Sequence, residues 1–176
     1  MRRFILLALA FTGFLTTAIA DEYTSETGKF TITFPGKTKE KTKLKETPVP
    51  LPDGTKATMH SALYEFADNN DEYSYLASYT DYPESTLKVA PQKILAGVRD
   101  DRVMGGRLLD DKEITYGDDK VPGREFVIEN DQKGFMRFRA YLRGTRLYQI
   151  GVTAVTNEGI VSQKSDKYLD SFKIAK

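Results

Sequence analysis

Residues 135–155 read FMRFRAYLRGTRLYQIGVTAV, and they carry the clearest structural signal in the chain. Aromatic, aliphatic and polar side chains alternate on both sides of Arg143, Gly144 and Thr145. This period of two, in residues that favour strands, is typical of paired β-strands. A glycine between the two halves can adopt the positive φ that a tight turn requires. The stretch is therefore predicted to form an antiparallel hairpin, with strands at residues 135–142 and 146–155.

The same alternation recurs upstream and predicts further strands at residues 30–34, 55–66, 73–82, 108–116 and 124–129. Two segments have helical spacing instead. One contains Ile94, Leu95 and Val98 and runs from Pro91 to Gly105 and Gly106; the other contains Val161, Tyr168, Leu169 and Phe172. Because neighbouring strands usually pair, this order predicts an α+β fold with a largely antiparallel sheet of about seven strands, packed with two amphipathic helices.

Three further expectations concern packing and the edges of this sheet. Residues 21–27 are predicted to be a polar lead-in, and the proline-rich residues 48–52 to be an edge or a loop, because proline cannot donate a ladder hydrogen bond. Apolar positions on the strand and helix faces predict the core: Phe30, Ile32, Phe34, Leu95, Val98, Phe126, Leu142, Leu147, Leu169 and Phe172.

The first twenty residues have the pattern of a secretory signal peptide. Arg2 and Arg3 precede an apolar run, and residues 18–20 (Ala-Ile-Ala) supply small residues where a signal peptidase cleaves. The alternative is an uncleaved membrane anchor, but the run is short for a span and meets Asp21 at once. We expect residues 1–20 to be removed and residues 21–176 to form one domain. We also expect the mature protein to be monomeric and to be periplasmic or secreted.

Composition narrows the classes of function. The chain has no cysteine, which excludes thiolate catalysis, cysteine-ligated metals and a lipid anchor on cysteine. Its single histidine is His60, so a catalytic triad or a histidine metal site has little to draw on. Basic and acidic residues number 26 and 25, a balance that does not favour nucleic-acid binding. We expect no catalytic residue, metal or cofactor, and no transmembrane span beyond the leader.

Several short strings together resemble a known group of exported proteins. They are FPG at residues 34–36, YTDYP at 79–83, PGREF at 122–126, YLRGTRLYQ at 141–149 and LDSF at 169–172. Their order resembles small exported bacterial proteins of the PsbP and DcrB group. The resemblance implies an antiparallel sheet sandwiched by helices, and an accessory or binding role. The lipidation cysteine of DcrB-like lipoproteins is absent, so no phage-uptake or oxygen-evolution role is transferred.

Residues 37–45 (KTKEKTKLK) carry a lysine at every second position: Lys37, Lys39, Lys41, Lys43 and Lys45. On a strand these side chains would project from one face, about 6 to 7 Å apart. One interpretation is a surface for anionic lipid, cell-wall polymer or an acidic protein. The other is protection of a sheet edge against aggregation, which needs no partner. We favour edge protection.

A second candidate surface consists of arginines on the predicted strands, together with one tyrosine. Arg137 and Arg139 share a face, and the hairpin partner would bring Arg146 and Tyr148 alongside; Arg124 lies on the preceding strand. Guanidinium and phenol groups suit carboxylate or phosphate ligands. The simpler interpretation is cross-strand pairing of these arginines with Glu125, Glu129 and Asp131.

Two other groups have ordinary structural interpretations. The acidic residues 68–72 and 118–119 could offer oxygen ligands to calcium, but residues 68–72 lack the glycine and glutamate spacing of a calcium loop, and solvated turns are expected. Stacked tyrosines can line a sugar or peptide site, but half-buried sheet residues with their hydroxyls at the water boundary are the expected interpretation of Tyr64, Tyr73, Tyr75, Tyr79 and Tyr82. The sequence thus predicts an exported, non-enzymatic accessory or binding protein whose partner is an unidentified envelope protein or anionic ligand. The alternative is a small hydrolase or other enzyme whose carboxylates meet only in the fold.

Overall fold

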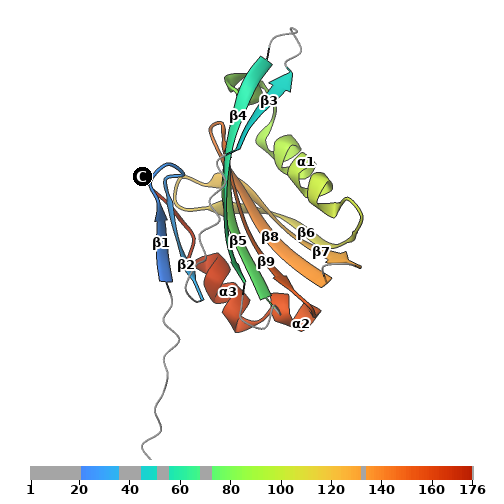
Figure 1. Ribbon diagram of the computed structural model, residues 1–176. Helices are drawn as coiled ribbons and strands as arrows, with labels where there is room; N and C mark the ends of the chain where they lie inside the picture. The colour runs from blue at the N-terminus through green and yellow to red at the C-terminus, as the bar shows by residue number, and fades with distance from the viewer. Residues whose placement is uncertain (1–20, 36–44, 51–55, 68–72, 132–133, 176) are drawn as a thin grey trace, which may run out of the picture.

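The computed structural model describes residues 21–35, 45–50, 56–67, 73–131 and 134–175 (Figure 1). No helix in these ranges is both long and apolar enough to cross a membrane. The elements in chain order are β1 (Asp21–Ser25), β2 (Phe30–Phe34), β3 (Lys45–Pro50), β4 (Lys56–Ala67), β5 (Tyr73–Asp81), η1 (Glu84–Lys88), α1 (Pro91–Val103), β6 (Arg107–Tyr116), β7 (Val121–Asn130), β8 (Gly134–Arg143), β9 (Arg146–Ala154), α2 (Asn157–Ile160), α3 (Gln163–Asp170) and β10 (Lys173–Ile174).

The strands form two sheets. The larger has seven strands in the order β3-β4-β5-β9-β8-β7-β6, and the smaller has three in the order β1-β2-β10. Every adjacent pair in both sheets is antiparallel. The predicted α+β class and the largely antiparallel sheet are confirmed.

The β8–β9 hairpin forms as expected at the centre of the larger sheet. Leu142 pairs with Leu147 and Arg143 pairs with Arg146, which leaves Gly144 and Thr145 as the connecting loop. Gly144 has a φ of 61°, in the region that favours glycine. The turn residue therefore sets the register, and the register determines which side chains of β8 and β9 share a face.

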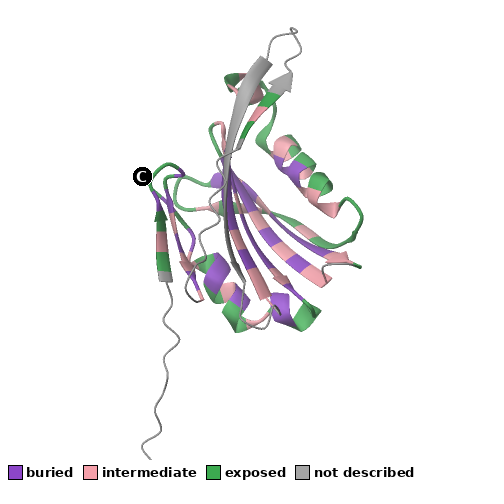
Figure 2. Cartoon of the chain, viewed as in Figure 1, coloured by how far each residue is buried: buried purple, intermediate pink, exposed green. Residues whose placement is uncertain are grey.

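Both faces of the larger sheet are covered, and apolar side chains are buried on each face (Figures 1 and 2). On one face α1 packs with Leu95 and Val98 against Phe126 and Phe138 of β7 and β8. On the other, β2 and α3 enclose an aromatic core that includes Phe172. The alternation along β8 supplies buried side chains on both faces, because successive side chains point to opposite faces.

All ten residues predicted to be in the core are buried. Their exposures run from 0% for Ile32, Phe34, Leu95 and Phe126 to 8% for Val98. The spacing of apolar residues therefore predicted these core positions correctly. Because both faces of the central strands are buried, apolar and polar residues alternate less regularly along them than along a sheet with one solvated face.

The structure corrects two expectations near the ends of the described chain. Residues 21–27 are not only a polar lead-in, because β1 pairs with β2 and Tyr23 packs against the aromatic core. The predicted helix from Val161 to Phe172 is shorter at both ends. Ser162 accepts a hydrogen bond from the amide of Ser165 and caps the start of α3, so Val161 lies before the helix. Phe172 lies beyond its end, just before β10.

The tyrosine expectation is also wrong in part. Tyr75 and Tyr79 are buried, at 0% and 3% exposure, whereas Tyr73 and Tyr82 are half-buried as expected. The reason is that β2 and α3 cover this face of β5, and Tyr168 packs edge-on against Tyr75 at 4.9 Å between ring centroids. The side chain of Tyr64 lies outside the described residues.

The proline-rich segment lies at an edge, as expected. β3 contains Pro48 and Pro50 and is the outermost strand beside β4. Lys45 is its first residue. Residues 37–43 of the lysine stripe lie outside the described residues, as do the side chains of Lys45 and His60.

Candidate functional site

Arg124 lies on the α1 face of the larger sheet, away from the other arginines of the predicted surface. Its Nε and Nη2 each donate to Asp111 at 2.6 Å. Asp111 also accepts from Arg99 of α1. The hydrogen bond from Arg124, together with that from Arg99, lowers the pKa of Asp111. Arg124 therefore joins β6, β7 and α1 in one ionic cluster.

Arg137 and Arg139 lie on the opposite face and share Glu125 of β7. Arg139 Nε donates to Glu125 Oε2 at 2.5 Å, and Arg137 Nη2 lies 3.3 Å from the same oxygen. Lys112 approaches the other oxygen at 2.7 Å. The side chain of Glu125 is only 5% exposed. The expected pairing of these arginines with Glu125 is thus present, while Glu129 pairs with Arg107 instead.

The outer ends of the same two arginines tie α3 to the sheet. Arg137 Nη1 donates to Asp166 at 2.7 Å, and Arg139 Nη1 donates to Asp170 at 2.6 Å. The two aspartates are four residues apart and so lie on one side of the helix. Two parallel arginines on β8 therefore bridge a buried glutamate and two helical carboxylates.

The electrostatics of Glu125 follow from this arrangement. Burial alone would raise its pKa, but hydrogen bonds from Arg139 and Lys112 and the charges of Arg137 and Arg139 outweigh it and lower the pKa to about 2. Hydrogen bonds to Glu125 and Asp170 likewise outweigh burial and raise the pKa of Arg139. The carboxylate remains ionised at neutral pH, with its charge already neutralised.

Arg146 and Tyr148 do not form an open surface with this cluster. Arg146 Nε and Nη2 donate to the two oxygens of Asp81 at 2.5 and 2.7 Å, and Nη1 donates to the carbonyl of Thr27 at 2.9 Å. Its guanidinium lies 4.8 Å from the Tyr79 ring centroid. Tyr148 is 3% exposed and packs edge-on against Phe30. The structure therefore does not bring the four arginines and Tyr148 together as a shared ligand surface.

A pocket of about 510 Å³ opens between β2 and α3. Phe34 and Tyr168 form its apolar wall, with ring centroids 5.5 Å apart. Exposed Lys164 and Lys167 line it from α3. Lys164 Nζ lies 4.6 Å from the Tyr73 ring centroid, which holds this ammonium group at an aromatic surface.

A short hydrogen-bonded link fixes the two sides of this pocket. The amide of Thr33 donates to the Ser171 hydroxyl at 2.9 Å, and that hydroxyl donates to the carbonyl of Tyr168 at 2.7 Å. Lys164 and Lys167 were not among the candidate residues predicted from the sequence. Their spacing of three on one helix was a visible signal, but the proximity of β2 was not.

Among the described residues, no three acidic or histidine side chains are placed to hold a metal ion. The described groups place an aromatic wall beside two lysines, and internal ion pairs connect the surrounding strands and helices.

The two sheets with helices on either side define a PsbP-like α+β fold. No family model matches the chain, and no curated protein sequence matches it. Among solved structures, the solution structure of cyanobacterial PsbP (CyanoP) from Synechocystis sp. PCC 6803 superposes with a TM-score of 0.55. The match covers 94% of this chain and 98% of the cyanobacterial one, at 11% sequence identity. At that identity the likeness establishes the fold.

Proposed function

We propose that this chain is an exported accessory protein of the cell envelope that acts by binding rather than by catalysis. Three arguments support the proposal. Residues 1–20 have the pattern of a signal peptide. The fold is PsbP-like, and the PsbP and DcrB group that the motifs resemble consists of accessory or binding proteins. The arginines first considered for a ligand surface are engaged with internal carboxylates, so they stabilise the fold.

The pocket between β2 and α3 is the observation that carries this proposal. Phe34 and Tyr168 offer an apolar wall, while Lys164 and Lys167 add positive charge beside it. Such a combination fits an acidic protein segment that also carries an apolar or aromatic side chain, because the ring would be buried and the carboxylates would meet the ammonium groups. The partner class we propose is therefore an acidic envelope protein.

This proposal predicts a charge-dependent capture. Residues 21–176 are immobilised and exposed to the detergent-solubilised envelope of the source cell, and the retained protein is quantified by mass spectrometry. Lys164→Glu combined with Lys167→Glu is expected to lower retention by roughly tenfold or more, since each reversed charge opposes an acidic partner.

The matched control is Lys88→Glu combined with Lys93→Glu, which reverses two exposed lysines on η1 and α1. This control is expected to retain the partner as the wild type does. Equal retention by the wild type and the Lys164 and Lys167 variant would contradict a role for this pocket.

The lysine stripe is proposed to protect a sheet edge, in keeping with the position of β3 at the edge of the larger sheet. Replacing Lys39, Lys41 and Lys43 with glutamine is expected to increase aggregation, measured by light scattering during incubation. Wild-type protein is expected not to sediment with anionic vesicles in low salt.

The control for the lysine stripe replaces Lys88, Lys93 and Lys173 with glutamine, which removes the same charge from exposed positions elsewhere. It is expected to aggregate less than the stripe variant. Vesicle binding by the wild type that weakens with salt and disappears in the stripe variant would show instead that the stripe is an anion-binding surface.

A further inference from the structure

Arg102 differs from every other arginine among the described residues. Each of the others has a carboxylate oxygen within 4 Å: Arg99, Arg107, Arg124, Arg137, Arg139, Arg143 and Arg146. Arg102 has no such partner in this part of the chain. It is nevertheless only half exposed to solvent. An arginine removed in part from water without a carboxylate is an exception that calls for a physical reason.

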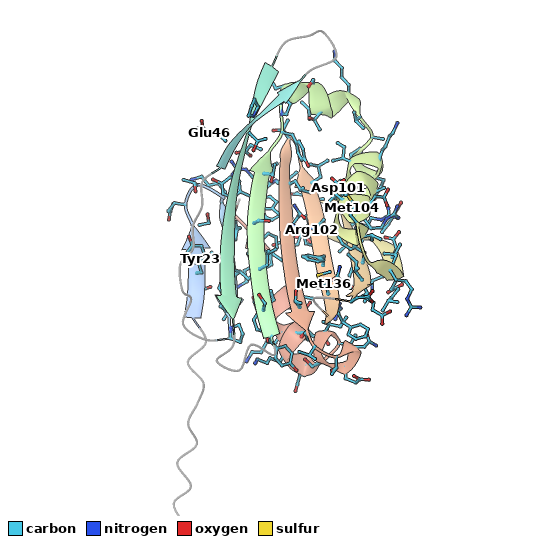
Figure 3. All side chains as sticks on the ribbon, turned by 45° about the vertical axis from the view of Figure 1, so that its right-hand side comes forward. Tyr23, Glu46, Asp101, Arg102, Met104 and Met136 are labelled. Atoms are coloured by element: carbon cyan, nitrogen blue, oxygen red, sulfur yellow. The ribbon has the colours of Figure 1, made fainter. Side chains whose placement is uncertain are left out.

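Two contacts hold the Arg102 guanidinium over the α1 face of the larger sheet (Figure 3). Its Nε donates to Gln149 Oε1 of β9 at 3.1 Å. Its Cζ lies 5.0 Å from the Phe138 ring centroid of β8. These contacts use one of the five N–H groups and one face of the plane. The orientation of the group is fixed before any ligand arrives.

The remaining N–H groups of Arg102, on Nη1 and Nη2, have no hydrogen-bond acceptor among the described residues. Both nitrogens are in contact with solvent. The fully buried side-chain atoms without a hydrogen-bond partner in this part of the chain are Tyr75 Oη and Gln92 Oε1, and neither Nη atom of Arg102 is among them. Burial lowers the pKa of Arg102, and the charge of the neighbouring Asp101 raises it only in part. The fork of two Nη atoms is thus oriented, accessible and partly dehydrated, which strengthens its attraction for an anion.

The residues around the Arg102 guanidinium indicate what kind of molecule would bring an anion to it. Ser78 lies directly opposite Gln149 on β5, so its hydroxyl shares the sheet face with the Gln149 amide. Leu76, the next residue of β5 on that face, packs with the apolar cluster that contains Phe138. Polar and apolar groups therefore lie side by side next to the guanidinium.

We propose that Arg102 anchors a second binding site, on the α1 face, for a small oxyanion ligand with an apolar body. The two Nη atoms would each donate to one oxygen of a carboxylate, and Gln149 would hold the guanidinium in place for that contact. A phosphate group offers the same two-oxygen geometry and is the other source of this chemistry. This site is separated from the pocket between β2 and α3 by the sheet itself.

Titration of the protein with sodium benzoate, followed by NMR, tests the proposal. The Arg102 Nε–H and Gln149 side-chain amide signals are expected to shift saturably with benzoate, at constant ionic strength maintained with chloride. Inorganic phosphate is titrated in parallel. Saturable shifts with phosphate alone would support the site and assign it to phosphate-bearing ligands. No saturable shift with either anion would overturn the proposal.

Variants separate a ligand contact from a packing role. Arg102→Gln is expected to weaken benzoate binding at least about tenfold, because it removes the charge-assisted pair. Arg102→Lys keeps the charge without the fork and is expected to bind with intermediate affinity. Arg143→Gln, at an exposed arginine on another part of the sheet, is the control and is expected to bind as the wild type does.

A thermal measurement gives a second, independent readout. Benzoate is expected to raise the Tm of the wild type and of Arg143→Gln, since a ligand that binds only the folded state stabilises it. Arg102→Gln is expected to show no such rise. An equal benzoate-induced rise in Arg102→Gln would contradict the proposal, and it would do so whatever the outcome of the capture experiment on Lys164 and Lys167.

Discussion

Phe172→Ala is expected to lower the free energy of unfolding by about 3 to 5 kcal/mol, a large part of the stability of a domain this size. Phe172 is 4% exposed and lies at the centre of the aromatic core. Its ring is 5.6 Å from those of Phe30 and Tyr148 and stacks on Tyr141 at 6.0 Å. The truncation removes contacts to β2, β8 and β9 together, and these strands cannot all close around alanine.

Urea unfolding followed by circular dichroism measures this effect as a shift in the midpoint. Val161→Ala is a suitable control, because Val161 is 54% exposed and the loss there is expected to stay within about 0.5 kcal/mol. A loss for Phe172→Ala as small as that of the control would show that Phe172 does not organise the core.

Glu125→Gln is expected to lower the free energy of unfolding by about 3 to 5 kcal/mol at pH 7, as measured for buried ion pairs that lose one partner. The substitution leaves Arg139 and Arg137 facing a neutral amide in a largely enclosed site. Their outer partners, Asp166 and Asp170, remain but are more exposed, at 49% and 65% of their side chains. They cannot replace the buried charge.

The same residue predicts a pH dependence. The pKa of Glu125 falls from its ordinary value of 4.5 to about 2 on folding. A carboxylate with a lowered pKa binds fewer protons in the folded state, so its contribution is complete above 4.5 and is lost as the pH falls toward 2. The stability difference between wild type and Glu125→Gln is therefore expected to narrow by about 3 kcal/mol between pH 6 and pH 2.

Glu129→Gln provides the matched comparison for Glu125. Glu129 pairs with Arg107 in a more exposed position, and its loss is expected to cost less than about 1 kcal/mol at any pH. If the wild type and Glu125→Gln lost stability in parallel as the pH fell, the buried carboxylate would not be the group that titrates.

The core could be predicted from the sequence because burial leaves a local signal. Alternation along β8 identified Leu142 as buried, and helical spacing identified Leu95 and Leu169. The order of strands leaves no such signal. β5 pairs with β9, far along the chain, and β10 is too short to show any period. The start of α3 depended on one capping serine inside a helical pattern.

The candidate sites were harder to predict, because partners of charged residues depend on strand order. The sequence predicted that Arg137 and Arg139 share a face and pair with Glu125. This pairing could be predicted because β7 and β8 are consecutive in the chain and pair with each other. The sequence did not place Arg124 on the opposite face or pair Arg146 with Asp81. The pocket lysines and Arg102 were missed for the same reason. The lysines of α3 line a pocket only because β2 lies beside them, and Arg102 of α1 is oriented by residues of β8 and β9.

The three-stranded sheet joins the two ends of the folded domain. β10 pairs with β2 through Lys173 and Thr31, and the amide of Ala175 donates to the carbonyl of Lys29 at 2.9 Å. A polypeptide emerges amino end first during synthesis, so the β1–β2 hairpin is released long before the strand that completes its sheet. Contacts between such distant segments also slow folding. The edge of β2 that pairs with β10 therefore stays unpaired while the intervening residues are synthesised, which gives chaperones time to bind there.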